Sequence, residues 1–201
     1  MPTSTVYPNS QILVSSALTK DQINAIIVPL TQGILGLSVD ANSGAVRTDW
    51  GTEGQPFAEV SDDICYIACV TDDGPYNKVR DKVATQNDDG SVTQNWAYTR
   101  IWKISWVLYG PNSTDRGRAI KSGLFMDWVC ATLSLSQLFP VTNYEEPRRV
   151  PELINGQFWE RVDYAVTMYE FVQETITDQT VLSVEVIGND NSGTIFDVTV
   201  K

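Results

Sequence analysis

The chain has 201 residues, of which 42% are hydrophobic and 19% charged, so it is long enough to bury a sizeable core within one domain. Its 25 acidic residues outnumber its 14 basic residues, and the net charge of -11 disfavours tight binding to the phosphate backbone of DNA or RNA. Histidine is absent and no apolar run approaches the ~20 residues of a membrane span, which argues against most enzymes and against a membrane protein.

The cysteines do not suggest a disulfide framework. Cys65 and Cys69 would lie about 13 Å apart if they share one strand, too far for a disulfide, and Cys130 falls in a helical stretch. Such usage indicates a reducing compartment. The first ten residues lack the basic and apolar segments of a signal peptide, so export by that route is not expected.

The first element expected is a helix that begins at about Lys20. Thr19 and Gln22 have the spacing of a capping box, and the apolar residues that follow recur at helical spacing. Pro29 is expected to kink or end this helix near Val28, because proline lacks an amide hydrogen. Residues 37–60 are rich in Asn, Ser, Gly and Thr and predict a loop with one short strand around 45–50.

Residues 64–70 predict a strand that is apolar on both faces and therefore buried on both. The chain then becomes acidic and rich in turn residues over 71–94, which predicts a hairpin arm or a loop. The acidic pairs Asp72-Asp73 and Asp88-Asp89 stand at its two ends.

A long strand is predicted over 95–109, where tryptophan, tyrosine and aliphatic residues alternate with polar ones. Its aromatic stripe comprises Trp96, Tyr98, Trp102 and Trp106. We interpret this stripe as the inner face of the sheet, and a stacking platform for sugars is the alternative.

A helix is predicted over 113–133, since Ile120, Leu124, Trp128, Ala131 and Leu135 keep to one stripe. Its two glycines, Gly117 and Gly123, would weaken it by ~1 kcal/mol each, which indicates close packing against a neighbour. The proline-rich residues 139–156 predict a loop.

A second long strand is predicted over 157–175, with one face apolar and the other polar before it turns aromatic at Tyr169 and Phe171. Its apolar face comprises Val162, Tyr164, Val166, Met168 and, after Glu170, Val172. Two shorter strands follow, over 181–188 and 194–200. The order of elements predicts an α+β fold, with a mainly antiparallel sheet and two flanking helices.

Sequence motifs for catalysis are weak. The stretch GRAIKSG at 117–123 lacks the glycine pattern of a phosphate-binding loop and lies within a predicted helix. Adjacent acidic pairs in turn-rich loops are usually solvated and do not match a metal-binding spacing. We therefore expect no enzyme, no cofactor and no metal site.

Several stretches together resemble the neck or tail terminator proteins of tailed bacteriophages. They are a strand that ends Val-x-Tyr-Gly-Pro-Asn at 107–112, a helix that starts at once, the loop EEPRRVPELINGQFWERVDY, and a final cluster of strands. The similarity spans about 18–187, with an inserted loop at 71–94, an N-terminal extension at 1–17 and a C-terminal strand or extension at 188–201.

The resemblance implies a structural virion protein, assembled in the host cytoplasm into a ring that is usually sixfold. Such a ring caps the tail tube and joins it to the head connector, while DNA passes through its channel without specific binding. The implied partners are other copies of the chain, the tail tube protein, connector or neck proteins and the tail sheath.

Candidate contact residues for this assembly lie on the matching loop and strand start: Arg148, Arg149, Trp159, Glu160 and Arg161. An ordinary solvated surface is the alternative for these residues. Asp72, Asp73, Asp88 and Asp89 are candidates for contacts made by the acidic loop toward a neighbour or the tube. The rival function is a soluble carbohydrate-binding module that uses the tryptophan stripe, and a hydrolase that uses two carboxylates is a third possibility.

Overall fold

The computed structural model describes residues 14–37, 45–48, 59–179, 184–189 and 195–200. Contacts divide the chain into two compact units. The core unit comprises Ala17–Val79 and Tyr98–Val172, and the strand unit comprises Met1–Ser16, Arg80–Ala97 and Gln173–Lys201.

The main sheet is mixed and has eight strands: β1 (Val14–Ser15), β2 (Val46–Thr48), β3 (Ile64–Asp72), β4 (Asp81–Gln86), β5 (Ser91–Tyr109), β6 (Leu138–Pro140), β7 (Arg148–Arg149) and β10 (Arg161–Gln179). Their order is β1-β10-β5-β3-β2, with β4 also paired to β5, and β6 and β7 also paired to β10. β2 is parallel to β3, and the pairings of β1, β6 and β7 with β10 and of β3 and β4 with β5 are antiparallel. Two separate antiparallel hairpins are formed by β8 (Glu152–Ile154) with β9 (Gln157–Trp159), and by β11 (Val184–Asn189) with β12 (Ile195–Val200).

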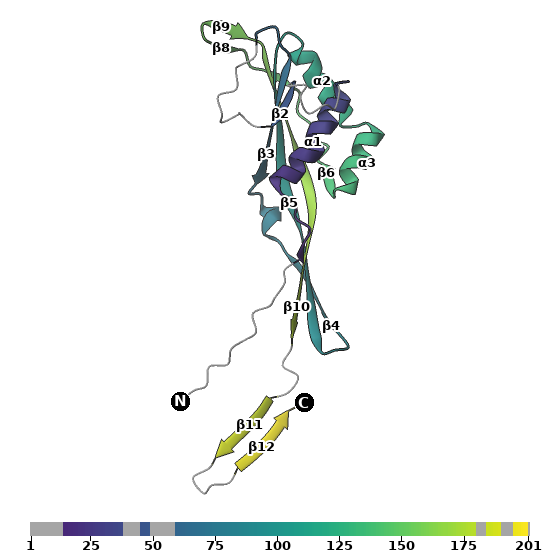
Figure 1. Ribbon diagram of the computed structural model, residues 1–201, viewed down its shortest axis with the longest axis vertical. Helices are drawn as coiled ribbons and strands as arrows, with labels where there is room; N and C mark the ends of the chain where they lie inside the picture. Colours follow the sequence, from purple (N-terminus) through teal and green to yellow (C-terminus); the bar gives the residue numbers. More distant parts are fainter. Residues whose placement is uncertain (1–13, 38–44, 49–58, 180–183, 190–194, 201) are drawn as a thin grey trace. The chain divides into compact units, whose positions relative to one another are not determined.

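Three α-helices cover one face of the sheet in the core unit (Figure 1). They are α1 (Lys20–Ile34), α2 (Ser113–Gly123) and α3 (Asp127–Leu135), and a short 3-10 helix, η1 (Pro75–Lys78), follows β3. The side chains between helices and sheet form one apolar cluster, which includes Ile27, Ile67, Trp106, Ile120, Leu133 and Met168. Within the described part of the chain, no helix is both long and apolar enough to cross a membrane.

The start of α1 is as predicted, and its end is not. Thr19 accepts the backbone N–H of Gln22, and the Gln22 side chain accepts the N–H of Thr19, so the capping box is confirmed. The helix does not end near Val28, because it continues through Pro29 to Ile34, and the alternative of a kink at Pro29 stays a prediction. A proline inside a helix costs roughly 3 kcal/mol, and the burial of Leu30 and its neighbours against the sheet offsets that cost.

The predicted single helix over 113–133 is two helices. The chain leaves helical geometry between Leu124 and Met126, where Met126 is extended with φ -69° and ψ 138°. This break rotates the second helix, so α3 buries Val129 and Leu133 and not the predicted Trp128, Ala131 and Leu135. The expected reason for the glycines is confirmed: a Cβ on Gly117 would lie 3.1 Å from a methyl of Val162, and one on Gly123 would overlap Ile34 of α1.

The strand predictions are confirmed at β2, β3, β5 and β10. Every member of the predicted apolar face of β10 is buried: Val162, Tyr164, Val166, Met168, Glu170 and Val172. Residues 139–156 are not one loop, because they contain the end of β6 together with β7 and β8, short strands on the margin of the sheet or in a hairpin. Residues 71–94 contain η1, β4 and the first residues of β5.

The α+β class and the mainly antiparallel sheet are confirmed, with β2 parallel to β3 in an otherwise mostly antiparallel sheet. The number of helices is corrected: the described residues form three α-helices and not two, because of the break after α2. The backbone of the two C-terminal strands is present as β11 and β12, while the side chains on which their alternation was predicted lie outside the described residues, as do residues 1–13.

Candidate assembly interface

Arg161 is the centre of an ion-pair cluster at the start of β10. Its guanidinium donates to both carboxylate oxygens of Asp163, from Nε at 2.7 Å and from Nη2 at 2.9 Å, and Nη1 donates to Glu152 Oε2 at 3.1 Å. The hydroxyl of Tyr109 donates to the same oxygen of Glu152 at 2.7 Å. These partners fix the fork geometry of the arginine, and β10 is therefore joined to β8 and to the end of β5.

The hydrogen bonds of this cluster favour the charged forms of Arg161 and Glu152 and the neutral form of Tyr109. The hydrogen bond to Asp163, followed by that to Glu152, raises the pKa of Arg161 above its ordinary value. The hydrogen bond from Tyr109 and that from Arg161 lower the pKa of Glu152. Burial, followed by the hydrogen bond to Glu152, raises the pKa of Tyr109, which therefore keeps its proton and acts as a donor.

Arg149 and Glu160 form a second, more exposed pair. Arg149 Nε donates to Glu160 Oε2 at 2.7 Å, and its Nη2 contacts Oε1 of the same carboxylate. The hydrogen bond from Arg149 lowers the pKa of Glu160. The backbone N–H of Val150 donates to the carbonyl of Arg161 at 2.8 Å, and this bond extends the pairing of β7 with β10.

The β8–β9 hairpin has one buried side and one exposed side. Its turn residues Asn155 and Gly156 both have positive φ, 50° and 78°, the conformation that an Asn-Gly turn favours. Trp159 packs edge-on against Tyr109, with ring centroids 6.2 Å apart, within a small cluster on the sheet face opposite the helices. The cross-strand pair Leu153 and Phe158 is left 60% and 76% exposed. These two side chains form an apolar pair that the described residues leave largely uncovered.

A groove of about 640 Å³ opens in the core unit, and Asp163, the partner of Arg161, lies in its wall. Its charged lining side chains are Lys103, Glu145, Glu146, Arg148 and Asp163. Because Asp163 pairs across the ladder with Arg148, both lie on the polar face of β10. The groove therefore carries charges of both signs.

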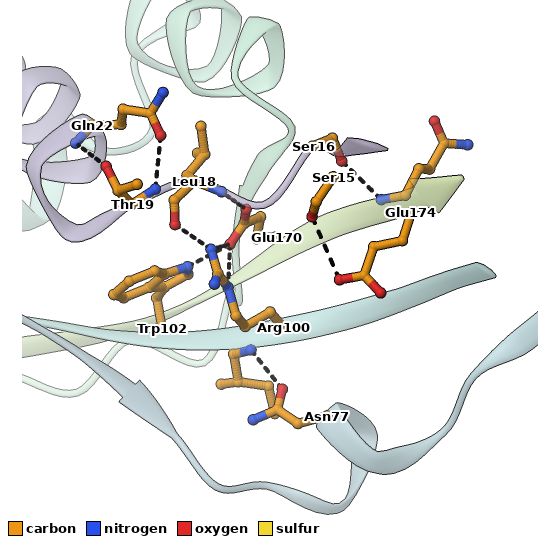
Figure 2. Close-up of polar contacts among 12 residues, drawn as sticks. Ser15, Ser16, Leu18, Thr19, Gln22, Asn77, Arg100, Trp102, Glu170 and Glu174 are labelled. Carbon is orange, nitrogen blue, oxygen red and sulfur yellow. Dashed lines mark hydrogen bonds and ion pairs between the residues drawn. The ribbon is translucent and has the colours of Figure 1, made fainter. Parts of the chain in front are cut away.

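A third polar cluster lies under the helices and involves Glu170 (Figure 2). This carboxylate is 1% exposed and accepts hydrogen bonds from the N–H of Leu18 at 2.7 Å, from Arg100 Nε at 2.7 Å and from Trp102 Nε1 at 2.6 Å. Arg100 also donates to the carbonyl of Leu18. The buried ion pair thus fixes the backbone just before the cap residue Thr19 of α1.

The predicted contact residues fall into three places. Arg148, Arg149, Trp159, Glu160 and Arg161 lie together around β7, β9 and the start of β10. Asp72 and Asp73 lie at the far end of β3, where Asp73 is 3.6 Å from Lys78, while Asp88 and Asp89 belong to the β4–β5 turn of the strand unit. Asp89 Oδ1 accepts both the N–H and the hydroxyl of Ser91, and these bonds lower the pKa of Asp89.

The tryptophan stripe does not form an open platform. Trp102 and Trp106 are 4% and 1% exposed, and Trp106 stacks on Tyr164 and donates to Thr31 Oγ1 at 3.0 Å. The core interpretation is therefore confirmed for these two side chains, and nothing in their surroundings supports the carbohydrate-binding alternative.

Chemistry that would suit an enzyme is sparse. None of the three cysteines forms a disulfide, and burial raises the pKa of Cys65 to about 12, so its thiol stays protonated. In the described part of the chain no three His, Cys, Asp or Glu side chains converge in a way that could hold a metal ion.

Sequence reasoning missed Glu152, Leu153 and Phe158. The signal for all three was the Asn155-Gly156 pair flanked by apolar residues, which is typical of a tight hairpin. It also missed the Arg100–Glu170 pair, whose signal was one carboxylate within the apolar face of one long strand and one arginine within the aromatic face of the other.

Comparison with known proteins agrees with the resemblance found in the sequence. None of the curated proteins that were searched matches the chain. A family model described as phage neck terminator protein matches residues 21–195, which include the core unit from Asp21 onward, the β4–β5 hairpin and β10. That family consists of structural proteins of the phage neck. The chain belongs to the phage neck terminator protein family.

Proposed function

We propose that the chain is one subunit of a ring, six copies in our proposal, that caps the tail tube and joins it to the head connector. Its membership in the neck terminator family is the observation that carries this proposal. The two 19-residue strands β5 and β10 support it, because in the core unit each packs one face against the helices, while the other face carries charged side chains such as Lys103 and Asp163. Strands of this kind can line a channel and meet a neighbouring copy along their edges.

In this proposal DNA passes through the ring without being held. A chain with a net charge of -11 repels duplex DNA at long range, even though the groove on the polar face carries both signs. Electrophoretic mobility of duplex DNA, measured with increasing protein at low salt, should not change. A tight complex under these conditions contradicts the proposed passage.

The proposed contact surface consists of the side chains around the β8–β9 hairpin. Arg148 and Arg149 are exposed, and Leu153 and Phe158 add an apolar pair beside them. Trp159 is buried, so its proposed role is to anchor the hairpin, while Arg161 and Glu160 hold the strands on which the contacts stand. We propose the acidic pairs at Asp72-Asp73 and Asp88-Asp89 as contacts toward a neighbour or the tube.

Other copies, the tail tube protein, connector or neck proteins and the tail sheath are the proposed partners, in a virion assembled in the host cytoplasm. Native mass spectrometry and negative-stain microscopy of the purified chain should find a ring. Addition of that ring to growing tail tubes should stop their elongation, and bovine serum albumin at the same concentration serves as the control. A chain that stays monomeric at high concentration and leaves tube growth unchanged contradicts the proposal.

A further inference from the structure

The strand unit has no apolar core among its described side chains. Every buried hydrophobic residue belongs to the core unit, and Ser91 is the one buried residue that the structure describes in the strand unit. A β-sheet normally buries at least one face against another layer, and strands that bury neither face are marginally stable in water. The described side chains of β4 and of the adjoining ends of β5 and β10 therefore do not provide the packing that a sheet usually requires.

The register of the β4–β5 hairpin shows which backbone groups point outward from β4. Two backbone hydrogen bonds close the connecting turn: the N–H of Gly90 donates to the carbonyl of Asn87 at 3.0 Å, and the N–H of Asn87 donates to the carbonyl of Ser91 at 2.8 Å. Asn87 and Ser91 are therefore a hydrogen-bonded pair, and such pairs alternate along an antiparallel ladder. Along the register from that pair, the backbone groups of Val83 and Thr85 bond to β5. The N–H and C=O groups of Lys82, Ala84 and Gln86 point away from β5.

This outer edge of β4 is open in the described part of the chain. β4 pairs with β5 alone, and all six of its residues are exposed, including Val83 at 62%. The usual protections of an edge strand are weak here, since β4 has no proline. Its one lysine, Lys82, lies over the ring of Trp96 at 5.5 Å from the centroid.

Charge favours a second copy of the chain as the partner of this edge. Two copies that each carry -11 repel one another over most of their surfaces. Along β4, however, Asp81 is balanced by Lys82, and the paired part of β5 from 91 to 97 has no charged side chain. The paired strands of the hairpin, as distinct from its acidic turn at Asp88-Asp89, are thus a place where like copies can meet without net repulsion.

We propose that β4 pairs with an edge strand of a second copy, through the backbone N–H and C=O groups of Lys82, Ala84 and Gln86. This inference rests on the proposed ring and names one of its subunit contacts. The partner strand is a different edge of the second copy, because pairing of β4 with another β4 is isologous and stops at a dimer. Strand addition of this kind takes its affinity mainly from backbone hydrogen bonds.

The test compares Ala84→Pro with Ala84→Thr. Proline removes an outward N–H and leaves the bonds of β4 to β5 in place, which an edge strand tolerates, whereas threonine keeps the N–H. We expect Ala84→Thr to assemble like the unaltered chain, and Ala84→Pro to require at least a tenfold higher concentration, by native mass spectrometry. Hydrogen exchange supplies a second measurement: Ala84 and Gln86 amides should become protected when the unaltered ring forms.

The outcomes separate this inference from the proposed function. Exchange of the Val83 and Thr85 amides in Ala84→Pro should match that of the unaltered monomer, which shows that the hairpin is intact. If Ala84→Pro then forms rings as readily as Ala84→Thr, the inference is wrong and the ring stands. If Ala84→Pro forms rings that no longer stop tube growth, the edge of β4 contacts the tube protein, and the inference that it pairs with a second copy is wrong. If the unaltered chain never assembles, both proposals fail.

Discussion

The two ends of β5 lie in contrasting surroundings. In the core unit the strand packs between helices on one face and the Tyr66, Tyr109 and Trp159 cluster on the other. In the strand unit the same strand is held by its ladder with β4 and by hydrogen bonds between polar side chains, such as Thr175 to Asn95 at 2.8 Å. Burial is thus the main source of stability in the first case and a minor one in the second.

This contrast teaches that stability and assembly can be assigned to different parts of one strand. A residue of the core unit loses its contacts when the chain unfolds, so its replacement should be measured as a change in unfolding free energy. An exposed residue of the strand unit makes few contacts in the monomer, and its replacement should change mainly the association of copies.

The largest effect is expected for Trp106→Ala. This side chain is 1% exposed, its ring centroid lies 5.6 Å from that of Tyr164, and it donates to Thr31. Its loss leaves a cavity in the core and removes the hydrogen bond to Thr31, whose hydroxyl still donates to the carbonyl of Ile27, so the unfolding free energy should fall by about 4 kcal/mol. Urea unfolding followed by far-ultraviolet circular dichroism measures the change.

Trp96→Ala is the matched control, since it removes the same side chain from the same face of β5 within the strand unit. Trp96 is half-buried and contacts Lys82, a cation–π interaction that contributes about 0.5–1 kcal/mol. If Trp96→Ala lowers the unfolding free energy as much as Trp106→Ala does, the strand unit has a core of its own, and the contrast between the two ends of β5 is wrong.

Glu170→Gln should give the next largest effect. The change leaves Arg100, one fifth exposed, without its counter-charge, and places an amide among the donors of Leu18 and Trp102. Breaking a buried ion pair on one side typically costs 3–5 kcal/mol, and the partial exposure of Arg100 places the expected loss at about 3 kcal/mol. The same urea titration measures it.

Glu174→Gln is the control for this prediction, because Glu174 lies four residues later on the same strand, within the strand unit. One of its contacts is a long, exposed hydrogen bond of 3.4 Å from Ser15, and because surface polar contacts contribute little, we expect a change within about 0.5 kcal/mol. Equal losses for Glu170→Gln and Glu174→Gln mean that the polar contacts of the two units contribute alike.

The sequence predicted best where one periodicity persists. The alternation over Val162 to Val172 gave the buried face of β10 correctly, and the Thr19–Gln22 spacing gave the start of α1. These signals are local, and tertiary packing agrees with them. The predicted end of α1 failed at Pro29 because the burial of later residues outweighs a local cost that the sequence alone suggests.

The candidate interface was predicted only in part, for a similar reason. Basic and aromatic residue types drew attention to Arg149 and Arg161, but their partners are determined by pairing between separated segments. That Trp159 is buried while its neighbour Phe158 is exposed follows from which side of a hairpin meets Tyr109. Alternation predicts two unlike sides, and only the packed fold shows which one is covered.

A smaller effect concerns acid stability. The folded chain lowers the pKa of Glu152, whose ordinary value is 4.5, so the ionised carboxylate stabilises the core unit above that value. The contribution is lost as the pH falls through the lower folded pKa. Glu152→Gln should therefore show a shallower loss of stability between about pH 5 and pH 3 than the unaltered chain, by urea unfolding at each pH.

Asp89→Asn is the matching variant in the strand unit, and it tests whether acid stability there is separate from that of the core unit. The pKa of Asp89 is also lowered, yet its bonds to Ser91 hold only the β4–β5 turn. Its replacement should leave the acid dependence of unfolding of the core unit unchanged. A similar flattening in both variants indicates that the turn and the core unit unfold as one.

The smallest effect on stability is expected for Phe158→Ser combined with Leu153→Ser. Both side chains are largely exposed, so the unfolding free energy should change by less than about 0.5 kcal/mol. The hairpin is nevertheless anchored by Trp159 and by Glu152, so it presents this apolar pair in a fixed position. Ring assembly of the double variant, measured by native mass spectrometry, should weaken if the pair is a subunit contact. Unchanged stability together with unchanged assembly excludes the hairpin from that contact and leaves the edge of β4 as the stronger candidate.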